Sequence, residues 1–214
     1  YRCREAIKLK DWEATAIRTQ MTLAGGAIPE YPAYWKDLCA FRLVILANAS
    51  LEALGPEQRY QLRRFVEIGG GLLILGGKSA YGNGGIRGSF LEEILPVLPA
   101  DTRFDIVPNQ APLASDKAAE TLKLTLAADL VSPYLHRVTL KPNATVLARA
   151  GQEPFLVTTA CGKGRIACLL GTPYGVAAKD EVLLTEWKEF PDFLGQIMEW
   201  LTLRDGKTQQ GGKP

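Results

Sequence analysis

Residues 41–77 read FRLVILANASLEALGPEQRYQLRRFVEIGGGLLILGG, and the fold class can be inferred from this segment. Two parts of it, 41–47 and 71–75, are short runs of branched apolar residues, which are typical of strands buried in a parallel sheet. Between them, Pro56 suits the first turn of a helix, and the apolar residues that follow recur at helical spacing, so a helix is predicted over 56–68. Strand, helix and strand in this order predict two parallel strands joined by a right-handed crossover.

Three β-type runs and one helix follow in the C-terminal half. The runs cover 145–148, 155–159 and 165–170. The last two flank Gly162-Lys163-Gly164, which predicts a β-hairpin. From Pro191 onward, apolar residues recur on one helical face, which predicts a closing helix. The predicted fold class is therefore α/β, with a mostly parallel sheet and a β-hairpin extension in the C-terminal half.

The remaining segments carry weaker patterns. Residues 1–10 have the pattern of the end of a helix, and 12–20 alternate apolar and polar residues, which favours a strand. Ser89 is expected to cap a short helix over 90–95. Three further segments are expected before residue 137: a strand at 103–107, a polar loop at 109–117 and an alternating run at 121–126.

The composition is that of an ordinary globular domain. The 214 residues are 47% hydrophobic and 22% charged, with 25 basic against 23 acidic side chains. These values exclude a disordered or fibrous chain. Basic residues alternate with acidic ones along the chain, so we expect no nucleic-acid partner. Every apolar stretch is far shorter than the roughly 18 to 20 residues of a membrane-spanning helix, so we expect no transmembrane segment.

We interpret residues 1–203 as a single domain. Residues 204–214 are polar and glycine-rich, which is typical of a flexible tail or linker. The chain begins at Tyr1 without a Met and shows no signal-peptide pattern, so we expect an excised piece of a longer protein, whose first strand can lie upstream. The compartment stays open between the cytoplasm and the soluble part of a membrane-anchored or exported protein.

The cysteines and the histidine point to no metal or cofactor. Cys3, Cys39, Cys161 and Cys168 lack CxxC spacing, and we expect a reduced set of core thiols. His136 is the only histidine, which excludes a histidine-rich metal site. We expect it to be a hydrogen-bonded or solvated side chain outside the ligand crevice.

The candidate site follows from the predicted sheet. In an open α/β sheet, ligands bind outside the carboxyl ends of the strands. The glycine-rich loop 76–88 follows the second strand, and its spacing matches neither a P-loop nor GxGxxG. Its backbone N–H groups, together with Lys78 and Arg87, are suited to a small polar or anionic ligand, and a plain surface turn is the alternative. The expected ligand-binding residues are Asn48, Gly76, Gly77, Lys78, Ser79, Tyr81, Asn83, Arg87 and Tyr174.

Several motifs in a fixed order resemble a known family. They are Asp37-Leu38 before 41–48, Gly69 to Gly77, Tyr81 to Gly85, Ile94 to Val97, Gly162 to Arg165, Gly171 to Pro173, and Trp200-Leu201. Over most of 37–203 the chain resembles the putative glutamine amidotransferase family of the class I glutamine amidotransferase-like superfamily, which is distantly similar to trehalose-utilisation proteins. The resemblance implies a flavodoxin-like three-layer sandwich, with a nucleophile elbow at Gly76 to Ser79.

The resemblance also implies which chemistry to look for. In active class I amidotransferases, a cysteine thiolate at the elbow attacks the amide of glutamine while a histidine relays the proton. The turn in this chain reads Gly76-Gly77-Lys78-Ser79-Ala80, without a cysteine, and His136 falls outside the matched motifs.

Three hypotheses follow for the function. The leading one is a non-catalytic amidotransferase-like domain that acts as a binding or interaction module. Its partners are other domains of the parent protein, a protein partner or a small polar or anionic ligand. The second is a hydrolase or transferase that uses Ser79 or Lys78 as the elbow nucleophile. The third is a purely structural domain.

Overall fold

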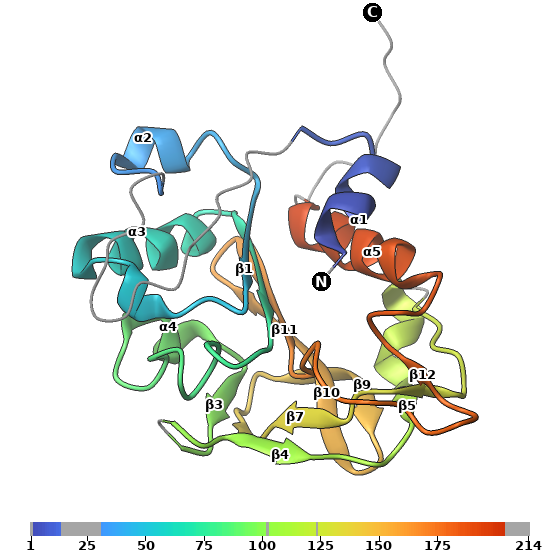
Figure 1. Ribbon diagram of the computed structural model, residues 1–214. Coiled ribbons are helices and arrows are strands. Elements are labelled where there is room, and N and C mark those ends of the chain that lie inside the picture. The colour runs from blue at the N-terminus through green and yellow to red at the C-terminus, as the bar shows by residue number, and fades with distance from the viewer. Residues whose placement is uncertain (1, 14–30, 102, 123, 204–214) are drawn as a thin grey trace, which may run out of the picture.

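A six-stranded mixed sheet forms the centre of the fold in the computed structural model, which describes residues 2–13, 31–101, 103–122 and 124–203 (Figure 1). The strands pair parallel from β1 through β2 to β11, and antiparallel from β11 through β10 and β9 to β5. In sheet order they are β1 (Leu43–Ala47), β2 (Gly71–Leu75), β11 (Gly164–Leu169), β10 (Glu153–Cys161), β9 (Thr145–Ala150) and β5 (Leu113–Ser115).

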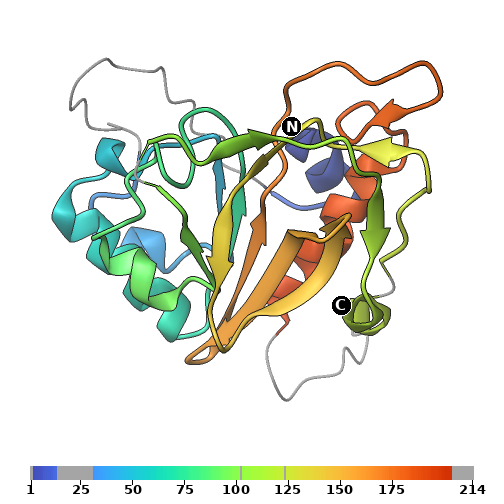
Figure 2. The same cartoon turned by 90° about the horizontal axis from the view of Figure 1, so that it is seen from below.

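Helices cover both faces of this sheet, which makes three layers (Figure 2). One face carries α2 (Trp35–Leu38), α3 (Pro56–Glu67) and α4 (Phe90–Ile94). The other carries α1 (Cys3–Leu9) and α5 (Phe190–Thr202). Strand β2 shows why the sheet is central, because Leu73 and Leu75 belong to one buried apolar cluster while Leu72 and Ile74 belong to the other. Burial of one such side chain contributes about 1.5–3 kcal/mol.

Short strands extend the fold beyond the carboxyl ends of the parallel strands. The pairs are β3 (Val97–Pro99) with β8 (Val138–Leu140), β4 (Ile106–Pro108) with β7 (Tyr134–His136), and β6 (Leu130–Val131) with β12 (Val182–Leu183). Two short 3-10 helices are η1 (Leu51–Ala53) and η2 (Lys117–Leu122). Strand β7 joins the end of β11 directly, since the His136 N–H donates to the Leu170 carbonyl and Leu135 bridges Gly171. Figure 1 shows β4 and β7 beneath the parallel strands.

The structure confirms the α/β, flavodoxin-like class and most of the long elements. The helix predicted over 56–68 is α3, the run at 71–75 is β2, and the C-terminal hairpin is β10 and β11. The expected strand at 41–47 begins two residues later, at Leu43, and lies at the sheet edge, where its first three residues are only half-buried. The sheet is parallel only in its β1–β2–β11 half.

The predictions between residues 100 and 137 were less accurate. The strand expected at 103–107 begins at Ile106, and the polar loop at 109–117 contains β5. The alternating run at 121–126 begins in the end of η2, and its described residues 124–126 form no strand. Ser89 does precede α4, but its hydroxyl donates to the Ile86 carbonyl and does not cap the helix. The strands between residues 100 and 137 depend on pairing with distant segments, which a local pattern does not contain. Most of the strand expected at 12–20 and the whole tail at 204–214 lie outside the described residues.

The fold contains no disulfide between its four cysteines. All four cysteines are free, as predicted, but only Cys168 is buried in the core, and Cys39 is exposed. Among the residues that the structure describes, no helix has the length and apolar character needed to cross a bilayer.

Candidate functional site

The turn after β2 is built from two glycines that leave no room for a side chain. Gly76 continues the ladder, since its N–H donates to the Leu169 carbonyl at 3.0 Å. A Cβ on Gly76 would lie 2.4 Å from the Gly171 carbonyl oxygen. Gly77 has a φ of +148°, and a Cβ there would lie 2.5 Å from Oδ1 of Asn48. The elbow therefore requires glycine at both positions.

Asn48 ties three strand ends together at this turn. It follows β1 with a φ of +49°, a conformation that asparagine tolerates better than most residues. Its Oδ1 accepts the Ser79 N–H at 2.8 Å, and its Nδ2 donates to the Tyr174 hydroxyl at 3.1 Å. Both polar atoms of the amide are thus engaged within the protein, which fixes the loop after β2 against the loop after β11.

A buried histidine and aspartate lie directly beneath the elbow. Nε2 of His136 accepts the Gly77 N–H at 3.0 Å, and Nδ1 lies 2.8 Å from Oδ2 of Asp105. The same Asp105 oxygen accepts the Gly82 N–H at 2.9 Å. Both side chains are 0% exposed, and the Tyr81 ring packs 4.6 Å from the imidazole. The pair therefore joins β7 and the segment before β4 to the glycine-rich loop.

This geometry assigns the proton on the imidazole. Because Nε2 accepts a backbone N–H, it carries no proton, and Nδ1 must donate to the Asp105 carboxylate. The arrangement has the carboxylate and histidine of a catalytic triad, but the third member is a backbone amide instead of a nucleophile. His136 has no ring nitrogen left to accept a proton from Ser79 or Lys78.

The position of His136 corrects the expectation from the sequence. The residue was expected outside the crevice, yet β7 brings it under Gly77, where its hydrogen-bonded state is as expected. Asp105 was not predicted at all. The one signal in the sequence was a polar residue inside an apolar run, Phe104-Asp105-Ile106-Val107 and Leu135-His136, which does not identify a partner.

Seven of the nine expected ligand residues lie at or just behind the rim of the elbow, the surface formed by the loops after β1, β2 and β11. At the rim lie exposed Lys78, Asn83 and Tyr174, with half-buried Asn48 and Ser79 beside them and Gly76 and Gly77 buried behind. Asn83 donates to the Lys78 carbonyl at 2.7 Å, which closes the loop on itself.

The other two expected residues point elsewhere. Tyr81 is fully buried, and its hydroxyl lies 3.1 and 3.2 Å from the carbonyls of Ile74 and Leu169 in the core. Arg87 donates to the carbonyls of Pro99 and Ala100, both at 3.2 Å, and so fastens the far end of the loop to β3. Both side chains therefore have structural contacts away from the rim.

None of the four thiols lies at the elbow. Cys168 is inside β11, and burial raises its pKa to about 12. Burial also raises the pKa of Cys161, which ends β10, and of Cys3 in α1. Cys39 precedes β1, at the opposite end of the parallel strands. Within the described ranges, no three His, Cys, Asp or Glu side chains form a cluster suited to a metal ion.

Comparison with known proteins places the chain by family and by fold. A family model described as "Putative glutamine amidotransferase" matches residues 16–203. Two cytoplasmic proteins of known structure from Salmonella typhimurium, STM1381 from strain LT2 and STM3548, are 17% and 16% identical to this chain, with TM-scores of 0.69 and 0.70. The matches cover 80% and 81% of this chain and 76% of each of those chains.

A third structure shares the fold over almost the whole chain. It is a ThuA-like protein from Parabacteroides merdae, with a TM-score of 0.61 at 12% identity over 97% of this chain and 86% of that chain. No curated protein matches the sequence.

Proposed function

Because this chain belongs to the putative glutamine amidotransferase family, we propose that it is a non-catalytic member that serves a larger protein as a binding or interaction module. The observation that carries the proposal is the hydrogen bond from the Gly77 N–H to Nε2 of His136. It lies at the turn where active enzymes of this class hold their nucleophile, and it uses the nitrogen that a catalytic histidine needs.

The missing nucleophile supports the proposal on steric grounds. A cysteine at position 77 would bring its Cβ within 2.5 to 2.8 Å of three atoms of the Asn48 side chain. Asn48 is itself held by Ser79 and Tyr174, so it cannot move without breaking those bonds. The turn therefore has no space for a side chain at position 77.

The lack of an available histidine base supports the non-catalytic assignment independently of the missing nucleophile. A general base must lie within hydrogen-bond reach of the proton that it takes. His136 is fully buried and its two ring nitrogens are engaged by Gly77 and Asp105, so neither Ser79 nor Lys78 has a histidine available for activation. His136 therefore lends no support to the alternative of a Ser79 or Lys78 enzyme.

The rim of the elbow is the part of the site that is left for binding. Lys78, Asn83 and Tyr174 are exposed there, and the Lys78 ammonium favours an anionic group on a ligand or on a neighbouring domain. Behind them, the Asn48 and His136 contacts hold the loop rigid, which lowers the entropy lost on binding.

A glutamine hydrolysis assay tests the proposal. We expect the purified chain to release no more ammonia from glutamine than the heat-denatured chain does. The electrophilic glutamine analogue 6-diazo-5-oxonorleucine should add no mass to the protein. Hydrolysis that is abolished by an alanine at Cys3, Cys39, Cys161 or Cys168 would overturn the non-catalytic assignment.

A binding experiment tests the second half of the proposal. Titration of the chain with inorganic phosphate and with glutamine, followed by amide shifts in NMR, should move signals of the 76–84 loop. The Lys78→Ala variant should weaken those shifts, and Lys163→Ala, which removes an exposed lysine from the β10–β11 turn, should not. Shifts that are equal in the two variants would contradict a role for the rim.

A further inference from the structure

A groove of about 530 Å³ opens at the amino ends of the parallel strands, which is the end of the sheet opposite the elbow. The segments that enter β1, β2 and β11 line it, together with the end of α5. Its lining includes Phe41, Arg42, Ile68, Gly69, Gly70 and Lys163. We call this cavity the amino-end groove. It shares no residue with the elbow, the rim or the Asp105–His136 pair.

Two glycines before β2 leave the middle of the groove without side chains. Because β2 lies between β1 and β11 in the sheet, Gly69 and Gly70 lie between the segment that holds Arg42 and the turn that holds Lys163. Gly69 has a φ of +126°, and a Cβ on Gly70 would lie 2.3 Å from the Phe65 ring. The fold therefore keeps the space between the two cations open.

Both charged side chains that line the groove are cations that solvent can reach. Arg42 and Lys163 are exposed, and neither side chain has a hydrogen bond or an ion pair with any residue that the structure describes. The neighbouring Glu67 is bound by Arg63 at 2.9 Å and by Arg64 at 2.5 Å, so its carboxylate is already neutralised. The groove thus carries an excess of positive charge, which acidic groups complement.

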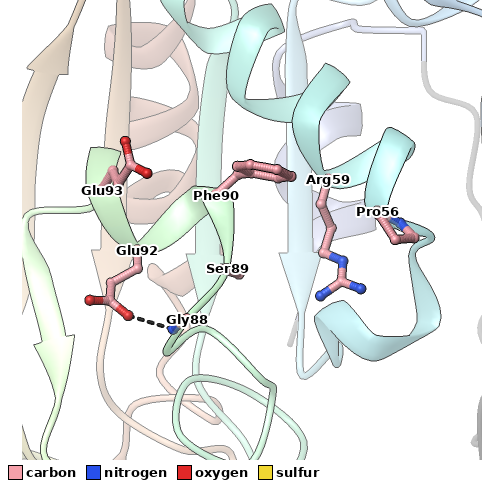
Figure 3. A pocket seen from close by; sticks show the side chains of 7 residues that line it. All are labelled: Pro56, Arg59, Gly88, Ser89, Phe90, Glu92 and Glu93. Atoms are coloured by element: carbon pink, nitrogen blue, oxygen red, sulfur yellow. Dashed lines mark hydrogen bonds between the residues drawn. The ribbon is translucent and has the colours of Figure 1, made fainter.

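The cavity between α3 and α4 differs in its charge (Figure 3). It has about 420 Å³, and its lining sets one arginine, Arg59, against two glutamates, Glu92 and Glu93. Its lining charges therefore favour no occupant. None of the described residues that line the amino-end groove is an Asp or Glu, so charge complementarity does identify an occupant there.

Exposed apolar side chains lie beside the two cations. Phe41 is 36% exposed and precedes Arg42 directly, and Ile68 is 49% exposed at the end of α3. Both line the groove. Exposed apolar side chains that are grouped beside polar ones mark surfaces where protein partners bind.

The sheet sets the distance between the cations. Arg42 and Gly164 both lie beside Gly70, one residue before the paired Leu43, Gly71 and Arg165. Neighbouring strands lie roughly 4.8 Å apart, so the backbones at Arg42 and Lys163 are on the order of 10 Å apart. An extended segment advances about 3.3 Å per residue, so two of its carboxylates can reach both cations when they are about two to four positions apart.

We propose that the amino-end groove is a docking site for an extended segment of a partner protein with two acidic residues, about two to four positions apart, around an apolar one. The carboxylates pair with Arg42 and Lys163, and the apolar side chain packs on Phe41 and Ile68. Residues 204–214 suit the groove less well, because they contain three basic residues and one acidic one. The groove is separate from the elbow, so this site goes beyond the proposed function and does not depend on it.

The test starts from random short peptides displayed on phage and selected on the full chain. We expect the selected peptides to carry two Asp or Glu about two to four positions apart, with Leu, Ile or Phe between them. The affinity of a selected peptide, measured by fluorescence anisotropy, should fall about three- to fivefold in Arg42→Met and in Lys163→Met, and about tenfold or more in the double variant. Ile68→Ala should also weaken binding.

Lys179→Met is the matched control. It removes the same charge from an exposed lysine in the loop after β11, at the other end of the strands, and should change the affinity by less than about twofold. Because neither Arg42 nor Lys163 has a side-chain partner among the described residues, Arg42→Met and Lys163→Met should keep Tm within about 2 °C of the wild type. A fall of more than about 5 °C would assign these side chains to the fold and overturn the proposal.

The exposed Cys39 thiol reports on the groove directly, because it lies in the lining. A saturating selected peptide should slow its alkylation by iodoacetamide. The same peptide with Asn and Gln in place of Asp and Glu should leave the rate unchanged. Unchanged alkylation with the acidic peptide would show that it binds elsewhere, which would overturn the proposal.

Further outcomes would also overturn the proposal. It fails if no peptide is enriched, if the enriched peptides lack the acidic pair, or if Arg42→Met and Lys163→Met bind as tightly as Lys179→Met. Slower alkylation of Cys39 at higher concentrations of the chain alone would assign the groove to a second copy. Protection of Cys39 by a synthetic peptide of residues 204–214 would assign it to that segment.

Discussion

The buried pair beneath the elbow makes a prediction that can be quantified. In His136→Leu, a side chain of similar bulk removes both hydrogen bonds of the imidazole. The buried Gly77 N–H loses its acceptor, which is unfavourable by about 1–3 kcal/mol. The Asp105 carboxylate, whose Oδ1 already has no partner among the described residues, loses one of its two donors, for about 1.5–3 kcal/mol.

The two losses together predict a destabilisation of about 3–5 kcal/mol, because they share one site and do not add fully. For a domain of this size, that corresponds to a fall in Tm of about 6–20 °C. Urea unfolding followed by far-UV circular dichroism measures it. His136→Gln should recover part of the loss, since its amide oxygen can accept the Gly77 N–H.

Tyr134→Phe provides the control, because Tyr134 lies on the same strand, β7, and is 39% exposed. It should change the free energy of unfolding by about 0.5 kcal/mol or less. A loss below about 1 kcal/mol in His136→Leu would mean that the pair contributes little to the stability of the fold, contrary to this prediction.

Three further predictions concern the glycines, the thiols and the core tyrosine. In urea unfolding, Gly77→Ala should lower the free energy of unfolding by about 2 kcal/mol more than Gly88→Ala. Both glycines have a positive φ, but only at Gly77 would an added Cβ collide with neighbouring atoms, those of the Asn48 side chain. Equal losses would contradict the elbow geometry. With Ellman's reagent at pH 8, the exposed Cys39 should react in the native protein. Cys168 should react only after unfolding, because it is buried and its raised pKa keeps it a thiol. Labelling of Cys168 in the native protein, detected by mass spectrometry, would contradict this. Tyr81→Phe should lower stability by about 1 kcal/mol and leave the affinity of any rim ligand unchanged; a weakened affinity would place Tyr81 in the binding site after all.

The elements that were predicted correctly are those whose sequence signals lie within the element itself. The run Gly71 to Leu75 is apolar on both faces because both faces are covered, so an unbroken apolar pattern identifies it as a central strand. Helix α3 has its start, its apolar face and its end within 12 residues, which is the range over which helical signals act.

The segment between residues 100 and 137 was predicted poorly because its strands have two or three residues each. Such strands are too short for an alternating pattern, and their positions follow from pairing with partners far along the chain. The same segment carries Asp105 and His136. The sequence and the family resemblance could therefore predict a glycine-rich turn without a cysteine after β2, but not that a buried histidine lies beneath it.

The position of the proton on the His136 ring shows whether this side chain holds the elbow. Long-range proton–nitrogen NMR at pH 7 reports which ring nitrogen carries the proton. The structure predicts a neutral ring with the proton on Nδ1 and with Nε2 as the acceptor of the Gly77 N–H. A proton on Nε2, or a ring protonated on both nitrogens, would show that His136 does not accept the Gly77 N–H and does not hold the elbow.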